Sequence, residues 1–277
     1  MQPMRLPYLL LAPAALILTS LSTHADFAYP DFSSTAGLQL NGAAAVSGTA
    51  LRLVPSVLNS GGSAFTAAQV PLGGLNSFST YFQFQITNPQ GIIDEDGSGA
   101  DGLVFVVQTV NNNVGGVGGG IGYAGINPSV GIEFDTYNNG VPAGDPSGNH
   151  VGIDLNGSLN SVVAVDEPDD RFNDGTVWNA WVDYDGTINQ LEVRWSRTQT
   201  RPILPQLSSN VNLTSVLGQN TAFLGFTAAT GSASGNHDIL NWQYVDEFAP
   251  IIVPEPTSAL FALGILGTIF QSRRRRA

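Results

Sequence analysis

The feature that most constrains this chain is the regular interruption of short apolar runs by glycine, proline and asparagine. The sequence holds 32 glycines and 16 prolines, and Asn-Gly and Asp-Gly pairs recur between runs rich in Val, Ile, Phe and Thr. Such runs favour β-strands joined by tight turns, and no convincing helical pattern lies between the two ends of the chain. We therefore expect an all-β protein with strands over residues 38–40, 50–53, 65–70, 79–86, 102–107, 130–135, 150–155, 162–165, 178–184, 190–196, 222–228 and 239–244.

A single sandwich domain accommodates this number of strands. A chain of 277 residues is long enough to bury a sizeable core, and without cysteine it uses no disulfides. Alternation of apolar and polar residues over 81–86 predicts sheets with one buried and one wet face. The tryptophans could stack against a ligand, but their apolar strand neighbours favour core positions for most of Trp178, Trp181, Trp195 and Trp242.

The charge of the chain limits its partners. The net charge is −12, and half of the 10 cationic residues lie at the two ends, as Arg5 and as residues 273–276. The body is therefore strongly acidic and would repel phosphate backbones, which disfavours nucleic-acid binding. Divalent cations and neutral polyols remain suitable partners.

The first 25 residues are typical of a secretory signal. Arg5 supplies the positively charged n-region, and residues 9–21 form the apolar run. Thr-His-Ala at 23–25 provides the small residues expected before a cleavage site. The apolar run is shorter than the ~20 residues that a membrane span needs, so an uncleaved anchor is the weaker alternative. We expect export and a domain that begins at Asp26.

The last 27 residues, 251–277, carry a second targeting pattern. Val-Pro-Glu-Pro at 253–256 precedes an apolar stretch over 259–270 and then four arginines. This arrangement resembles the PEP-CTERM sorting tail, which implies processing by an exosortase-type enzyme and delivery to the cell surface or an extracellular matrix. A simple C-terminal membrane anchor is the alternative, because the arginine block would stay on the cytoplasmic side in either case.

One acidic segment carries the candidate chemistry. In a strand over 130–135, Glu133 and Asp135 share a face because residues two apart point the same way. The following loop adds Asn139, Asp145 and His150, which gives oxygen donors suited to Ca²⁺ and a mixed nitrogen and oxygen set suited to Mn²⁺. A solvated acidic loop is the plainer interpretation, but so many carboxylates together would repel one another without a cation.

Several motifs in this segment and around it resemble those of legume-type (L-type) lectins. Glu-Phe-Asp-Thr-Tyr at 133–137, Asp-Pro-Ser at 145–147 and Gly-Ile-Asp at 152–154 resemble the metal loop of that family. Further similar motifs are Ala-Asp-Gly at 100–102, the glycines at 118–120, and Phe-Thr-Ala-Ala-Thr-Gly at 226–231. The resemblance spans nearly all of residues 26–246 and implies a legume-type lectin domain over 26–250, with a concanavalin-like jelly-roll β-sandwich of two large antiparallel sheets.

The resemblance also implies a set of metal ligands. A transition metal such as Mn²⁺ would be held by Glu133, Asp135, Asp145 and His150. Ca²⁺ would be shared by Asp135 and Asp145 and completed by Asn139 and the backbone carbonyl of Tyr137. The metals would fix the loop without doing chemistry.

The carbohydrate contacts implied by the resemblance come from several loops. They are Asp101, Gly119, Gly120, Tyr137, Asn139, Ser232 and Ala233. Asp101 would accept hydrogen bonds from hydroxyls and the Asn139 amide would donate one, while Tyr137 would stack on the sugar ring. A cis peptide between Ala100 and Asp101 is also implied.

Several questions stay open in this interpretation. The segment from Asp135 to Asp145 is one residue longer than the usual family spacing, so either Asn138 or Asn139 could be the calcium and sugar ligand. A glycoside hydrolase on the same fold is an alternative, although Asn138 stands where its third acid would fall, and we expect no enzyme. A structural matrix protein that no longer binds sugar is the other alternative. A homo-oligomer is possible, but no motif specifies one.

Overall fold

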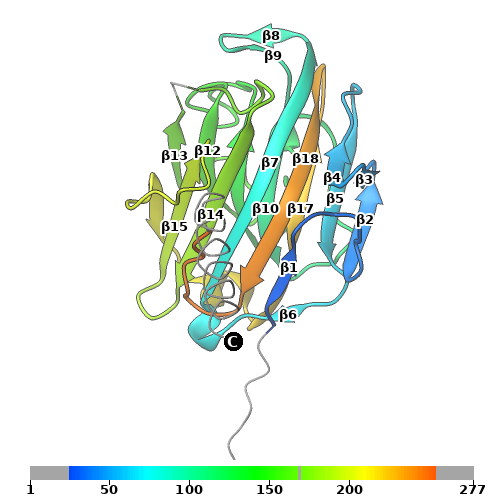
Figure 1. Ribbon diagram of the computed structural model, residues 1–277. Helices are drawn as coiled ribbons and strands as arrows, with labels where there is room; N and C mark the ends of the chain where they lie inside the picture. Colours follow the sequence, from blue (N-terminus) through cyan, green and yellow to red (C-terminus); the bar gives the residue numbers. More distant parts are fainter. Residues whose placement is uncertain (1–24, 168–169, 254–277) are drawn as a thin grey trace, which may run out of the picture.

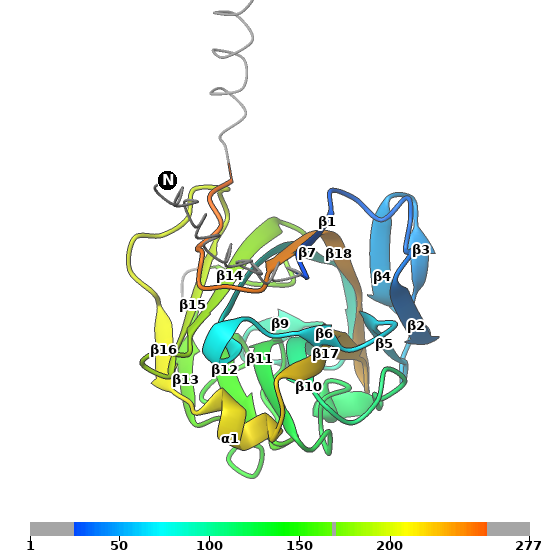
Figure 2. The same ribbon diagram turned by 90° about the horizontal axis from the view of Figure 1, so that it is seen from below.

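The computed structural model describes residues 25–167 and 170–253 and consists of two stacked antiparallel sheets (Figures 1 and 2). The first sheet contains, in spatial order, β16 (Leu207–Asn210), β15 (Gln190–Ser196), β14 (Val177–Asp185), β7 (Phe78–Gly91), β18 (Ala233–Val245), β4 (Ala50–Val54) and β3 (Ala45–Ser47), with β1 (Phe27–Tyr29) paired to β18. The second sheet contains β13 (Val163–Asp166), β12 (His150–Leu155), β11 (Ser129–Asp135), β10 (Gly102–Gln108), β17 (Thr221–Ala229), β5 (Gly61–Thr66) and β2 (Leu38–Gly42), with β6 (Val70–Pro71) paired to β17. The expected all-β jelly-roll sandwich is confirmed.

A few short elements complete the described part of the chain. A hairpin of β8 (Ile93–Asp94) and β9 (Gly97–Ser98) projects beyond the end of β7 (Figure 1). Two 3₁₀ turns, η1 (Gly74–Asn76) and η2 (Gly118–Gly120), lie in loops. Among the described residues, no helix is long and apolar enough to cross a membrane. The predicted signal and sorting segments lie outside the described residues, apart from Ala25 and residues 251–253.

The expectation of no helix in the body of the chain was wrong at one place. A short helix, α1, spans Leu213–Leu217. The Asn212 side chain accepts a hydrogen bond from the Ser215 N–H at 2.8 Å, and Gly218 ends the helix with a φ of 69°. An asparagine at the first cap and a glycine after the last turn are the usual boundaries of a helix, so the signal was present in the sequence.

The main core lies between the two sheets and is rich in aromatic rings. Phe82 on β7 packs against Phe226 on β17 with ring centroids 5.0 Å apart, and Phe84 meets Phe134 on β11 at 4.9 Å. Each such pair contributes about 0.5–1.5 kcal/mol beyond the burial of its area. All four tryptophans are buried, as predicted for most of them. This core fixes the position of β11, the strand that carries the candidate metal ligands.

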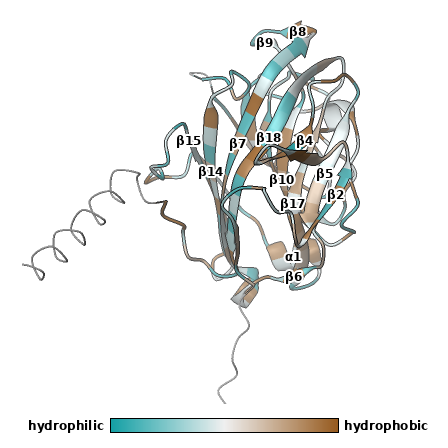
Figure 3. Ribbon diagram, turned by 45° about the vertical axis from the view of Figure 1, so that its right-hand side comes forward, coloured by the Kyte–Doolittle hydropathy of each residue, from teal (hydrophilic) through white to brown (hydrophobic). Residues whose placement is uncertain are grey.

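The expected alternation of buried and wet faces holds only in part. Figure 3 shows hydrophobic and hydrophilic positions alternating along β7, where Gln83 and Gln85 are partly exposed. On the second sheet, however, every residue of β10 and β11 is buried. A second apolar cluster, which includes Val104, Ile121 and Tyr123, covers the outer face of that sheet. The site strands are therefore enclosed on both faces.

His237 on β18 is buried as a neutral imidazole. Its side chain has no exposed surface, and its Nδ1 lies 2.9 Å from the Gly235 carbonyl oxygen. This contact places the proton on Nδ1. Burial lowers the pKa of His237 to about 4, and the Gly235 carbonyl and Asp238 only partly oppose that effect.

We expect His237 to weaken the fold as the pH falls. The unfolded state, with its ordinary pKa near 6.5, takes up a proton before the folded state does, so stability is complete above about pH 6.5 and is lost towards pH 4. The loss is on the order of 3 kcal/mol. Urea unfolding of the parent and of His237→Gln, in chelator, at several pH values, measures it. If the free energy of unfolding changed with pH in the same way in both proteins, His237 would not be the source of the loss.

Candidate functional site

Three buried side chains from two neighbouring strands form a possible metal-binding cluster. Asp135 pairs in register with His150, and Glu133 pairs with Gly152 on the same ladder between β11 and β12. One ligand atom from each of Glu133, Asp135 and His150 lies within 4.8 Å of the others. The strand alternation that points Phe134 into the core therefore points both carboxylates at the histidine.

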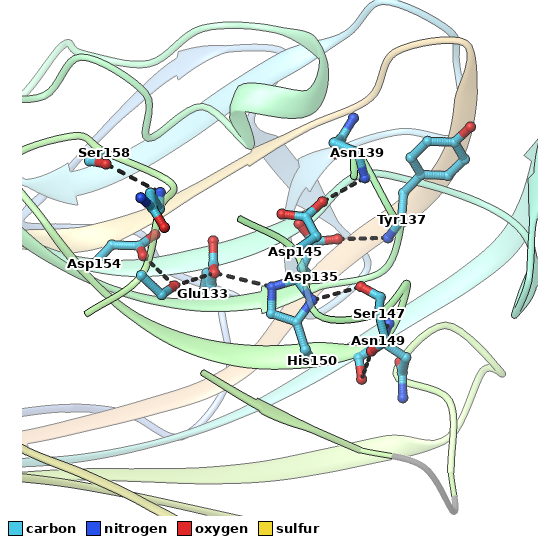
Figure 4. Close-up of polar contacts among 12 residues, drawn as sticks. Glu133, Asp135, Tyr137, Asn139, Asp145, Ser147, Asn149, His150, Asp154 and Ser158 are labelled. Carbon is cyan, nitrogen blue, oxygen red and sulfur yellow. Dashed lines mark hydrogen bonds and ion pairs between the residues drawn. The ribbon is translucent and has the colours of Figure 1, made fainter. Parts of the chain in front are cut away.

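The orientation of His150 turns one ring nitrogen, Nε2, towards the carboxylates of the cluster. Nδ1 lies 3.0 Å from the Ser147 carbonyl oxygen, an acceptor that requires a proton on this nitrogen. Nε2 then carries a lone pair in the neutral ring and faces the Glu133 carboxylate at 3.2 Å. Figure 4 shows the ring between Ser147 and Glu133, with Asp135 and Asp145 beside it. Burial lowers the pKa of His150, but Glu133 and Asp145 outweigh burial and raise it.

The surrounding carboxylates repel one another. The pKa of Asp135 is raised well above its ordinary value by burial first, and then by Glu133 and Asp145. Burial also raises the pKa of Asp145, although its Oδ2 accepts a hydrogen bond from the Asn139 N–H at 2.5 Å. These carboxylates and the inward-facing Nε2 of His150 fit a divalent cation, because a positive charge would replace the repulsion with attraction.

The close packing around Glu133 depends on a glycine. A Cβ atom at Gly152 would lie 2.3 Å from Glu133 Oε1 and 2.2 Å from Ser161 Oγ. Real Cβ atoms essentially never lie so close to other atoms, so any larger residue at 152 would force the ends of the Glu133 and Ser161 side chains to shift.

Substitution of this glycine is therefore expected to be costly. Gly152→Ala should lower the free energy of unfolding by about 1–3 kcal/mol, because Glu133 and Ser161 must both shift in a packed site. The control is Gly116→Ala, since a Cβ at Gly116 meets no atom within 4 Å. Urea unfolding without metal compares the two variants. Equal losses would show that the approach to Glu133 is not limiting.

Asp154 and Ser161 extend the cluster, and sequence reasoning did not count them as site residues. Ser161 Oγ lies 2.8 Å from Glu133 Oε1 and 2.6 Å from Asp154 Oδ1. A hydroxyl has a single proton to donate, so both contacts are hydrogen bonds only if one carboxyl is protonated. The pKa of Asp154 is raised well above its ordinary value by burial and by Glu133. The signal available in the sequence was the spacing of two from Gly152, which places Asp154 on the same face.

Next to the cluster is an open cavity of about 250 Å³. It is lined by Asn59, Ile92, Ala100, Asp101, Gly119, Tyr137, Asn139, Gly231, Ser232 and Ala233. The structure thus brings together all the predicted carbohydrate contacts except Gly120, whose Cβ position would face Ala124. The Ala100–Asp101 peptide is cis, as the resemblance implied.

Asp101 is the acidic group of this cavity. It is 4% exposed, and its Oδ2 has no hydrogen-bond partner among the described residues. Burial raises the pKa of Asp101 to about 7. An unpartnered buried carboxylate oxygen at a cavity wall is an acceptor available to a ligand hydroxyl.

The two asparagines of the neighbouring loop point in different directions. Asn139 lines the cavity, and a Cβ at Gly119 would lie only 2.6 Å from its Nδ2. Asn138 instead donates from its Nδ2 to Glu95 Oε1 at 2.5 Å, outside the cavity. The geometry favours Asn139 over Asn138 as the residue that meets a ligand.

Comparison with known proteins agrees with this geometry. The model of the legume lectin domain family matches residues 24–255. The chain belongs to the legume lectin family. A seed lectin of Styphnolobium japonicum is 32% identical over 243 residues, which cover 79% of this chain and 78% of that lectin.

Solved legume lectins share the fold over most of the domain. The lectin of Bauhinia forficata in complex with GalNAc has a TM-score of 0.69 and 25% identity, covering 80% of this chain and 98% of that one. Basic winged bean lectin with Tn-antigen has a TM-score of 0.66 and 30% identity, with the same coverage of 80% and 98%.

Some relatives of this legume lectin chain are much longer proteins. An L-type lectin-domain containing receptor kinase of Arabidopsis thaliana is 33% identical over 184 residues, 62% of this chain but 24% of the kinase. The chain thus spans about a quarter of that kinase and matches its lectin part. The legume lectin family match favours carbohydrate binding over the glycoside hydrolase alternative.

Proposed function

We propose that this legume lectin domain binds carbohydrate in the cavity beside Asp101, and that binding requires divalent cations in the adjoining acidic cluster. The observation that carries the proposal is the convergence of six predicted contact residues on one cavity, one of which, Tyr137, donates its N–H to the Asp135 carboxylate of the cluster. Asn139 and Asp145 join the two parts, because the Asn139 N–H donates to the Asp145 carboxylate.

The donor set fits the two ions expected from the sequence. A transition metal such as Mn²⁺ would be held by Glu133, Asp135, Asp145 and His150. Ca²⁺ would be held by Asp135, Asp145, Asn139 and the Tyr137 carbonyl. When bound, these cations would neutralise the buried carboxylates and hold the loop of residues 136–149 in one conformation.

The residues around the cavity have complementary roles towards a sugar. The Asp101 carboxylate would accept hydrogen bonds from hydroxyls, and the Asn139 amide and the Gly119 N–H would donate to hydroxyl oxygens. Glycine at 119 leaves room for Asn139 and for the ligand, because a side chain there would collide with the amide. The Tyr137 ring would cover the apolar face of the pyranose.

The ligand is proposed to be a polysaccharide of the cell surface or matrix. The signal pattern over 1–25 and the sorting pattern over 251–277 support export and processing by an exosortase-type enzyme. Solved relatives are complexes with GalNAc and with methyl-α-D-galactose, so galactose-type sugars are the first monosaccharides to test. Single contacts in an open site are weak, and display of many copies on a surface would raise the avidity.

The decisive experiment is glycan-array binding by residues 26–250 with Ca²⁺ and Mn²⁺, repeated after EDTA. We expect binding that is lost on chelation and restored by added metal, because the 136–149 loop depends on the cations. Binding that survives EDTA would rule out the metal requirement. Absence of binding by folded protein under both conditions would favour the structural matrix alternative.

Asp101→Asn tests the cavity itself. We expect binding on the same array to fall at least about tenfold, because the amide replaces an acceptor oxygen with a donor. Glu247→Gln is the matched control, since it removes the same charge at an exposed position on a different segment. Undiminished binding by Asp101→Asn would place the ligand elsewhere.

The choice between the two asparagines gives a separate prediction. Asn139→Ala should abolish detectable sugar binding, because its side chain lines the cavity. Asn138→Ala should retain measurable binding, since its side chain turns to Glu95. Calorimetric titration with a sugar identified on the array compares the two. The reverse order of effects would transfer the ligand role to Asn138.

A further inference from the structure

The hairpin of residues 91–98 contacts both Ser232 in the wall of the carbohydrate cavity and the 136–149 loop. It follows β7 and contains β8 and β9. On one side, the Ile92 N–H donates to the Ser232 carbonyl at 3.3 Å, and the Ile92 residue itself lines the cavity. On the other side, the hairpin contacts the 136–149 loop through its acidic turn.

Asp94 joins the hairpin to this loop with both of its carboxylate oxygens in use. Oδ1 accepts hydrogen bonds from the N–H groups of Asp96 and Gly97, at 3.0 and 3.2 Å, which closes the hairpin turn. Oδ2 accepts a hydrogen bond from the Asn138 N–H at 2.9 Å. Asn138 lies between Tyr137 and Asn139, so this bond fixes the backbone that presents both cavity residues.

Glu95 makes a second pair of contacts. Its Oε1 accepts from the Asn138 side chain at 2.5 Å and from the Gly148 N–H at 3.2 Å. Gly148 lies near the far end of the loop, two residues before His150. A Cβ at Gly148 would lie 2.2 Å from Asp94 Oδ2, so a glycine there allows the hairpin to approach. The hairpin thus holds the loop near both of its ends.

We propose that the 91–98 hairpin is a latch that holds the 136–149 loop in its binding conformation, with Asp94 as the main positioning residue and Glu95 in support. The inference rests on the proposed function, because the loop carries the proposed calcium and sugar ligands. Asp94 acts through the Asn138 backbone. A loop already held in place loses less conformational entropy when it binds a cation, so the latch raises affinity.

A general electrostatic role is the competing explanation for acids at this place. Any carboxylate near the loop would attract cations, whether or not it held the backbone. Asp96 separates the two effects. It lies on the same turn, and among the described residues no hydrogen bond joins its side chain to the 136–149 loop. Asp94→Asn and Asp96→Asn remove the same charge, but only the first replaces the acceptor that holds Asn138.

The first test is hydrogen exchange of the full domain in chelator. In Asp94→Asn, Oδ1 can still close the hairpin turn, whereas the amide nitrogen cannot accept from the Asn138 N–H. We expect the Asn138 amide to exchange about tenfold faster than in the parent, and Asp96→Asn to match the parent. Adding Glu95→Ala to Asp94→Asn should extend the change to the Gly148 amide. Equal exchange in Asp94→Asn and Asp96→Asn would overturn the latch.

The second test is calorimetric titration of the same proteins with Ca²⁺. Asp94→Asn should weaken Ca²⁺ binding about tenfold, and Asp96→Asn should weaken it much less. Equal weakening would assign the effect to charge and overturn the positioning role. A parent protein that binds no Ca²⁺ would instead remove the proposed function, and the latch's role with it. Melting temperatures near the parent's would show that both variants fold.

Discussion

The central constraint on this structure is the repulsion among carboxylates that two neighbouring strands bring together. Glu133 and Asp135 are 1% and 2% exposed, and Asp145 adds a third acid from the following loop. Isolated carboxylates at such depth are costly, and the raised pKa of Asp135 reports that cost. Among the described residues, the basic side chain paired with these acids is His150, whose Nε2 lies 3.2 Å from Glu133 Oε1. The arrangement is therefore suited to a bound cation.

The aromatic core makes this arrangement unavoidable. Phe134 packs against Phe84 with centroids 4.9 Å apart, which fixes the register and the phase of β11. A strand has two faces, so holding Phe134 in the core forces Glu133 and Asp135 onto the opposite one. The apolar packing between the sheets thus supplies the force that keeps the acids together, and Gly152 supplies the space.

The sequence predicted what is local and missed what joins distant segments. Strand alternation and loop order located Glu133, Asp135 and His150. Residues two apart share a strand face, and a short loop between antiparallel neighbours brings the next strand alongside. The resemblance to legume lectins added Asp101, which no periodicity would have placed beside Asn139. Neither approach found Asp94. Its partner Asn138 is 44 residues away in the sequence, and no motif in the hairpin points to that contact. The apolar cluster on the outer face of the second sheet was also not predicted, because part of it comes from irregular loops that are distant in the sequence.

The contacts of Asn138 and Asn139 explain why the two asparagines have different roles. Asn138 uses its N–H and its side-chain amide on the 91–98 hairpin, and Asn139 uses its N–H on Asp145. One residue is thereby held by the scaffold and the next by the cluster. The Asn139 side chain then remains available to the cavity, because its neighbour and its own backbone have satisfied the contacts that anchor the loop. A neutral hydroxylated ligand suits this cavity, since a side-chain amide and one buried carboxylate exchange hydrogen bonds with hydroxyls, whereas an anion would meet Asp101 and the acids behind it.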